Sequence, residues 1–205
     1  MAKLSTKASL LQQLIPQDFS LLMAGVRLEL LTPAHTDDLA IACQDGQLWE
    51  LIYTSTPTID GVADYIRTAE VMLDRIAFVV IDETTGKAIG TTSYHDILTA
   101  PKRLEIGYTW YAQSYWRSHV NTACKLMLMG YAFETLGYQT VGWRTDILNT
   151  RSQKAIERLG AKKDGIIRGN RLNKDGNISD TVMYSVIASE WPTVKANLTN
   201  KLERV

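Results

Sequence analysis

The sequence predicts a single domain of mixed α/β architecture, and three observations support this. Several stretches, most clearly residues 104–111, alternate between apolar and polar side chains with the period of two that a half-buried strand requires. Others, such as residues 120–136, repeat apolar side chains at helical spacing. Two turn-rich segments, 82–87 and 173–177, separate strand-like stretches and predict β-hairpins. No repeat or linker divides the chain, so we expect one folding unit.

Capping and turn signals place the elements in order. Residues 1–20 are predicted as an N-terminal arm, and residues 21–205 as one domain. Thr32 is a good N-cap, Pro33 a good first helical residue, and Gly46 ends that helix. Strands are predicted at 26–31, 76–81, 88–94, 104–111, 139–146, 165–172 and 178–187, and helices at 33–46, 60–74, 120–137, 150–160 and from 189 onward. The strand at 76–81 is so uniformly apolar that both of its faces should be covered.

Composition is that of an ordinary globular protein. Of its 205 residues, 45% are hydrophobic and 21% charged, which is enough for a substantial core. Lys+Arg and Asp+Glu balance at 22 each, so no overall field attracts nucleic acid or an anionic membrane. No apolar run reaches the ~20 residues needed to span a bilayer, and we expect a cytoplasmic protein. Cys43 and Cys124 are far apart and predict buried free thiols rather than a disulfide or a metal site.

The segment 104–122 carries the clearest functional signal. Alternation places four residues on one face of its strand (Leu104, Ile106, Tyr108, Trp110) and four on the other (Glu105, Gly107, Thr109, Tyr111). A short polar turn then leads into a helix. Such an arrangement puts free backbone N–H groups and the positive end of the helix dipole at the edge of the sheet. The segment therefore predicts an anion-binding site.

Two motifs resemble those of the GNAT N-acetyltransferase superfamily. The residues Glu-Ile-Gly-Tyr at 105–108, followed by Tyr-Trp at 115–116 and Val-Asn-Thr at 120–122, are similar to its acetyl-CoA strand and pyrophosphate loop. The similarity is greatest to the ribosomal-protein alanine acetyltransferase-like (RimJ/RimL-like) branch. Residues 149–161 resemble the family helix that follows the fifth strand. The resemblance covers about residues 26–187 and implies a mixed seven-stranded sheet, splayed between strands four and five, with helices on both faces.

The resemblance also implies an activity, the transfer of an acetyl group from acetyl-CoA to a primary amine by direct attack in a ternary complex. The acceptor would be a protein N-terminus or a small amine. The pantetheine arm would pair with the backbone of Tyr108, Thr109, Trp110 and Tyr111, with an N–H near Tyr111 as oxyanion donor. The diphosphate would contact the loop formed by Trp116, Arg117, Ser118, His119, Val120, Asn121 and Thr122.

Catalytic roles follow from the same resemblance, each with an alternative. Glu105 is the candidate general base, acting through water, or else an ordinary strand carboxylate paired with Arg103 or another neighbour. Asn149 would contact the pantetheine and Ser152 would donate a proton to the departing sulfur, unless both are only cap and first-turn residues.

His119 stands where the family pattern has glycine. Its imidazole either points outward or toward phosphate, or it fills the diphosphate site. The second outcome leaves an alternative function, a GNAT-fold CoA-binding or partner-binding module without turnover.

The acceptor side is less defined. Trp49, Tyr53 and Thr54 lie in the loop that forms one wall of the acceptor pocket in this superfamily, although Trp49 and Tyr53 could equally pack on the core. Tyr184 either lines the same pocket or belongs to the core. The amphipathic C-terminal helix and the N-terminal arm could form a homodimer or fold back on their own chain. The three histidines are scattered and predict no metal site.

Overall fold

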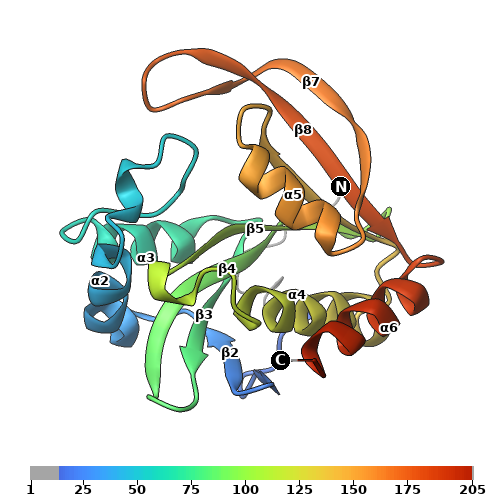
Figure 1. Cartoon of the computed structure of the whole chain (residues 1–205), viewed down its shortest axis with the longest axis horizontal. Coiled ribbons are helices and arrows are strands. Elements are labelled where there is room, and N and C mark those ends of the chain that lie inside the picture. The colour runs from blue at the N-terminus through green and yellow to red at the C-terminus, as the bar shows by residue number, and fades with distance from the viewer. Residues whose placement is uncertain (1–13, 205) are drawn as a thin grey trace, which may run out of the picture.

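The computed structural model describes residues 14–204, which form one eight-stranded sheet with helices on both faces (Figure 1). The strands are β1 (Ser20–Met23), β2 (Val26–Leu30), β3 (Ile76–Asp82), β4 (Lys87–Leu98), β5 (Arg103–Tyr111), β6 (Thr140–Asp146), β7 (Lys162–Leu172) and β8 (Ile178–Ile187). The helices are α2 (Thr36–Gln44), α3 (Val62–Val71), α4 (Val120–Gly130), α5 (Thr150–Arg158) and α6 (Trp191–Leu202). Short 3-10 turns occur at η1 (Pro33–His35), η2 (Leu48–Glu50) and η3 (Gln113–Tyr115), and η4 (Tyr131–Thr135) is a π-helical turn.

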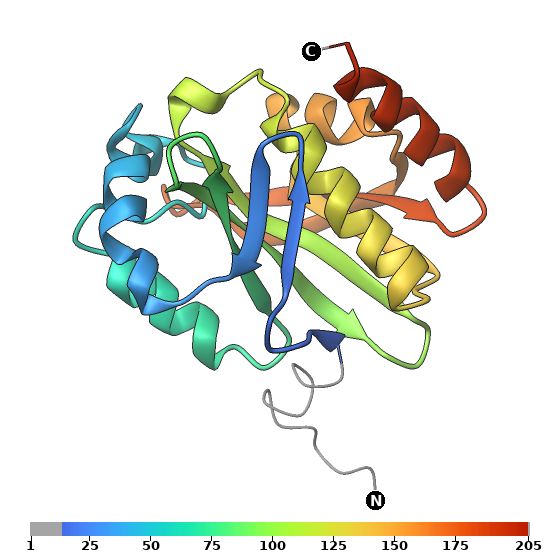
Figure 2. The ribbon, with the colours of Figure 1, turned by 90° about the horizontal axis from the view of Figure 1, so that it is seen from below.

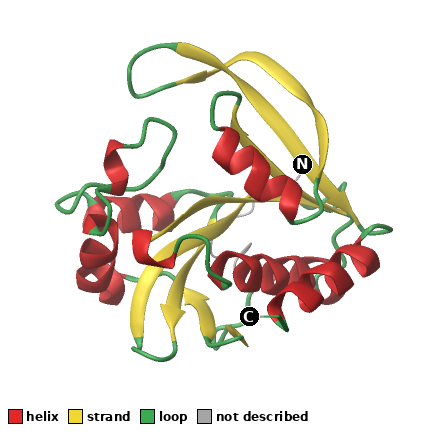
Figure 3. Ribbon diagram, viewed as in Figure 1, coloured by secondary structure: helices red, strands yellow, loops and turns green. Residues whose placement is uncertain are grey.

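The strand order is β1-β2-β3-β4-β5-β6-β8-β7. Neighbouring strands are antiparallel except β5 and β6, which are parallel. Figure 3 shows the β7–β8 hairpin reaching well beyond the rest of the sheet. None of the helices in the described part of the chain is long and apolar enough to cross a bilayer.

Two hydrophobic cores lie on opposite faces of the sheet. The larger packs α4, α5 and α6 against one face, and the smaller packs α2 and α3 against the other (Figure 2). Strand β3 serves both, since Phe78 and Val80 enter the first core and Val79 and Ile81 the second. The prediction that this apolar strand is covered on both faces is confirmed. Cys43 and Cys124 are buried free thiols, also as predicted.

Strand β1 is the element that the sequence did not predict. It pairs with β2 through a turn at Ala24 and Gly25, both at positive φ, and makes the sheet eight-stranded rather than seven-stranded. The predicted arm therefore meets the sheet at Ser20, and Ile15 and Phe19 are buried in the first core. The part of the predicted arm before residue 14 lies outside the described residues, and the domain boundaries stay a prediction.

Strand β5 carries a bulge that changes the predicted faces. Its register with β4 shifts between the pairs Thr91–Trp110 and Ser93–Gly107, and Tyr108 has φ +50°. An extra residue at a bulge reverses the direction of the side chains that follow it. Trp110 consequently joins the second core, and Tyr111 joins the first together with Leu104 and Ile106. The prediction that Trp110 shares a face with Leu104 and Ile106 is wrong.

The splay between the fourth and fifth predicted strands is present as the separation of β5 from β6. Their register covers only residues 103–105 of β5 against 140–142 of β6. The remaining residues of β5 extend beyond this pairing toward the beginning of α4.

The C-terminal helix α6 folds back onto its own chain. It buries Trp191, Val194 and Leu198 in the core it shares with α4. The Trp191 ring stacks on Phe133, with ring centroids 5.3 Å apart.

Candidate functional site

A large open cleft lies where β5 and β6 separate. Its volume is about 1360 Å³. It is lined by the second half of β5, the beginnings of α4 and α5, the loop after η2, and Arg171 of the β7–β8 hairpin. The bulge at Tyr108 lies within it, so an irregular stretch of strand backbone borders the open space.

The loop between β5 and α4 is held by its own hydrogen bonds. Trp116 Nε1 donates to the Tyr111 carbonyl at 2.9 Å, and Ser118 Oγ donates to the Tyr115 carbonyl at 2.7 Å. Arg117 has φ +60°, which turns the chain into the helix. These contacts leave the start of α4 facing the cleft with the positive end of its dipole.

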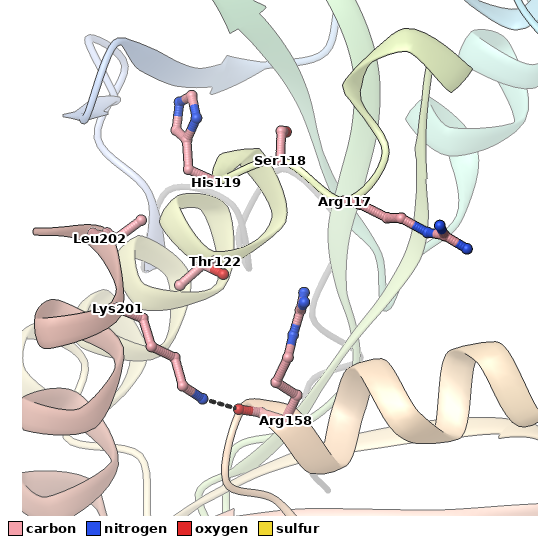
Figure 4. Close-up of a pocket in the computed structure, with 7 residues that line it drawn as sticks. All are labelled: Arg117, Ser118, His119, Thr122, Arg158, Lys201 and Leu202. Atoms are coloured by element: carbon pink, nitrogen blue, oxygen red, sulfur yellow. Dashed lines mark hydrogen bonds between the residues drawn. The ribbon is translucent and has the colours of Figure 1, made fainter. Parts of the chain in front are cut away.

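The imidazole of His119 points away from this space. Its Nε2 lies 3.0 Å from the carbonyl of Ala24 in the β1–β2 turn, and in Figure 4 the ring is directed away from Arg158 and Lys201. His119 has φ −70°, so a side chain is accommodated here without backbone strain.

A small cavity of about 260 Å³ lies beside the start of α4, and several of the side chains that line it are positively charged. Arg117, Thr122, Arg158 and Lys201 contribute to its wall (Figure 4). Lys201 Nζ donates to the Arg158 carbonyl at 2.6 Å and thereby joins α6 to the end of α5. The positive side chains surround the same helix end that exposes free N–H groups, which makes this the most favourable place in the cleft region for phosphate.

Helix α5 forms the opposite wall. The Asn149 side chain caps it by accepting from the Ser152 N–H at 3.0 Å. The Gln153 side chain donates to the Ile147 carbonyl at 2.7 Å, just before the helix begins. The half-buried Ser152 lines the cleft, and the Arg151 guanidinium lies 4.2 Å from the centre of the Trp116 ring, across the opening.

Glu105 is buried and fully engaged in an ion pair. Its two carboxylate oxygens accept from Arg144 of β6 at 2.7 and 2.9 Å, and Arg103 lies 3.7 Å away. Only 3% of its side chain is exposed. Arg144 also contacts Asp96 at 3.0 Å, so one guanidinium joins two carboxylates. Between the predicted roles for Glu105, base or paired carboxylate, the contacts show pairing, with Arg144 as the main partner.

His95 is the functional candidate that sequence reasoning missed. It lies opposite Glu105 in the β4–β5 register, lines the cleft, and its Nδ1 is 2.6 Å from Asp96 Oδ2. Burial lowers the pKa of His95 below its usual value, while Asp96 and Glu105 act in the opposite direction. The adjacent His-Asp pair was visible in the sequence, but its position beside Glu105 depends on strand register.

Ligand atoms of His95, Asp96 and Glu105 all lie within 4.8 Å of one another, which is close enough to consider a metal ion. Arg144 already binds both carboxylates. The protein therefore supplies the positive charge of this cluster itself.

Lys125 is a second buried polar residue on the cleft wall. Its Nζ donates to Thr92 at 3.0 Å and to Thr109 at 2.6 Å. Burial lowers its pKa from 10.5 to about 8. A lysine inside the apolar run of α4 was the available sequence signal.

Of the predicted acceptor residues, Tyr53 and Thr54 line the cleft. Trp49 and Tyr184 do not. The Trp49 side chain packs against the second core, and Tyr184 is 1% exposed with its hydroxyl donating to Glu157. For both residues the core alternative describes the structure.

Comparisons with known proteins agree with this geometry. The family model described as an acetyltransferase (GNAT) domain matches residues 26–162. A Bacillus subtilis protein provisionally named ribosomal N-acetyltransferase YdaF is 32% identical over 106 residues, which are 52% of this chain and 57% of the relative. The uncharacterised N-acetyltransferase YoaA of the same organism is 27% identical over 50% of this chain and 57% of its own length. The chain thus spans little more than half the length of these curated relatives.

Solved structures extend the likeness to most of the chain. A GCN5-related N-acetyltransferase from Brucella melitensis has a TM-score of 0.82 and 30% identity, covering 91% of this chain and 86% of that one. Mycobacterium smegmatis RimJ, solved with CoA-disulfide, has a TM-score of 0.72 at 17% identity, covering 87% and 90%, and shows likeness of fold. With a family match over residues 26–162 and the separated strands that hold its cleft, the chain belongs to the GNAT acetyltransferase family.

Proposed function

We propose that the protein is an acetyl-CoA-dependent N-acetyltransferase that acts on a primary amine by direct attack in a ternary complex. One observation carries the proposal: β5 leaves β6 after residue 105 and ends beside the start of α4. This arrangement offers strand backbone to amide groups and free helix N–H groups to phosphates at the two ends of one cleft.

The residues present fit a CoA thioester. The backbone of residues 108–111 borders the cleft and is the proposed partner of the pantetheine amides. The loop of residues 116–122 is the proposed diphosphate site, with Arg117, Arg158 and Lys201 adding positive charge. His119 is directed at Ala24, so its ring leaves the helix end open.

The carboxylates of Glu105 and Asp96 are the proposed attraction for the acceptor. A primary amine reaches the site largely as an ammonium ion, and Asp96, which lines the cleft with 42% of its side chain exposed, is the carboxylate that it can approach directly. Glu105 adds its charge from within the ion pair with Arg144 and Arg103. Ser152 keeps its proposed role as proton donor to the departing sulfur, since it lines the cleft on α5. The provisional name of YdaF, a ribosomal N-acetyltransferase, favours an amine of a protein over a small molecule as the acceptor.

Two measurements test the function together. Calorimetric titration with acetyl-CoA is expected to show saturable binding, and thiol release is expected when peptides with free N-termini or small primary amines are added. Binding without thiol release for any amine supports the alternative of a CoA-binding module without turnover. Absence of binding at millimolar acetyl-CoA refutes both.

A further inference from the structure

We propose that His95, held by Asp96, is the general base that takes the proton from the acceptor amine. This inference rests on the function proposed above and assigns a step of that reaction to a residue outside the family motifs. It is carried by the hydrogen bonds of the imidazole, by its place over the β5 bulge, and by the ion pair that occupies Glu105.

The His95–Asp96 contact fixes which ring nitrogen is basic. Nδ1 lies 2.6 Å from Asp96 Oδ2, and a carboxylate can only accept a hydrogen bond. In the neutral ring the proton is therefore on Nδ1, and Nε2 keeps its lone pair. Within residues 14–204 no hydrogen-bond partner meets Nε2, although His95 lines the open cleft.

The position of Nε2 is set by Gly107. A Cβ built on Gly107 would lie 2.2 Å from Nε2, so the imidazole rests directly on the backbone of β5 one residue before the bulge at Tyr108. The Tyr108 ring contacts the imidazole edge-on, with centroids 5.2 Å apart. The free nitrogen thus lies next to the strand segment that is proposed to hold the thioester.

Glu105 is less suited to receive this proton directly. Both of its oxygens accept from Arg144, and a proton arriving at either oxygen would have to displace a charged hydrogen bond. The charged groups around the His95 ring come from three neighbouring strands. Asp96 on β4 and Glu105 on β5 carry negative charge, and Arg144 on β6 carries positive charge. Arg103, 3.7 Å from Glu105, adds a second positive charge. The carboxylates of Asp96 and Glu105 are the groups that stabilise the imidazolium formed when the amine loses its proton.

The step balances without any further reactant. The amine nitrogen attacks the thioester carbonyl carbon, a C–N bond forms and the C–S bond breaks. Before the attack, the acceptor ammonium gives one proton to His95 Nε2, which passes it to solvent. The second proton, which the nitrogen loses as the amide forms, is balanced by the proton that the thiolate takes to become CoA thiol. Because burial lowers the pKa of His95, the ring is neutral and able to accept a proton at neutral pH.

The first test is kinetic. A positioned general base contributes about 10²- to 10⁴-fold to rate, so His95→Gln should lower kcat by roughly 100-fold or more while calorimetry shows acetyl-CoA affinity within twofold of wild type. Added imidazole should restore part of the activity of His95→Ala, which a purely structural loss would not allow. The control is His35→Gln, a histidine that bonds Glu29 outside the cleft and should leave kcat unchanged.

The outcomes separate this inference from the proposed function. Acetyl-CoA binding and wild-type turnover in His95→Gln would refute His95 as the base and leave the acetyltransferase function standing. If no amine tested is acetylated, nitrogen NMR of the three histidines decides, with His95→Gln identifying the signal. A neutral ring protonated on Nδ1 at pH 7 supports the proposal. An imidazolium, or a ring protonated on Nε2, overturns it.

Discussion

Replacing the buried Lys125 with methionine should change stability in a direction that depends on pH. Only 4% of the residue is exposed, and burial lowers its pKa from 10.5 to about 8. Each pKa unit corresponds to about 1.36 kcal/mol, so burial of this ammonium ion lowers the free energy of unfolding by about 3 kcal/mol at pH 7. The unfolded chain keeps the proton more tightly, and wild-type stability therefore rises between pH 8 and 10.5.

In the methionine variant, the free energy of unfolding no longer depends on the titration of this lysine. It also loses two hydrogen bonds to Thr92 and Thr109, worth about 1 kcal/mol each, although the two hydroxyls remain 2.8 Å apart and bond each other. We expect Lys125→Met to be more stable than wild type by roughly 1 kcal/mol at pH 7 and less stable by roughly 2 kcal/mol above pH 10.5.

Urea unfolding followed by circular dichroism at pH 7.0 and pH 10.5 measures both values. The exposed Lys163→Met serves as the control for removal of a lysine as such. The reasoning is refuted if the difference between Lys125→Met and wild type is the same at the two pH values, because that result would mean that the lysine titrates alike in the folded and unfolded chains.

Three further predictions concern the cleft and its support. Glu105→Gln should lower turnover by roughly 10- to 100-fold with little change in acetyl-CoA affinity, since a charge worth a few kcal/mol is lost beside Arg144; unchanged thiol release would remove Glu105 from the mechanism. His119→Gly should leave acetyl-CoA affinity within about threefold in calorimetry, a difference below 1 kcal/mol, because the ring bonds Ala24; a tenfold gain would place the ring in the phosphate space. Trp191→Ala should destabilise the protein by about 3–5 kcal/mol in urea unfolding, since the ring is 5% exposed; a loss below 1 kcal/mol would show that α6 contributes little to the fold.

The sequence was most informative where one residue type decides the local structure. The uniformly apolar run at 76–81 indicated a strand between two cores, and the capping signal at Thr32 and Pro33 located the first helix. The alternation along 104–111 identified the central strand but not its bulge, because tyrosine does not signal a positive φ at position 108.

Features that depend on pairing between distant segments could not be predicted from the sequence. The ion pair of Glu105 with Arg144 joins residues 39 apart on the two parallel strands, and the placement of His95 beside Glu105 follows from the β4–β5 register. Strand β1 has only four residues, too few for a periodic pattern in the sequence. It is extended because it pairs with β2.

The short pairing between β5 and β6 has a mechanical consequence. Only three residues of each strand join the five-stranded part of the sheet, β1 to β5, to the three-stranded part formed by β6, β8 and β7. The Arg144–Glu105 ion pair connects the two parts close to where the pairing stops. A molecule that binds to both parts of the sheet would link them and would reduce the motion of β5 relative to β6. The backbone amides of residues 106–111 should then exchange their hydrogens with solvent more slowly. The exchange rate of these amides would therefore report whether the cleft holds a ligand.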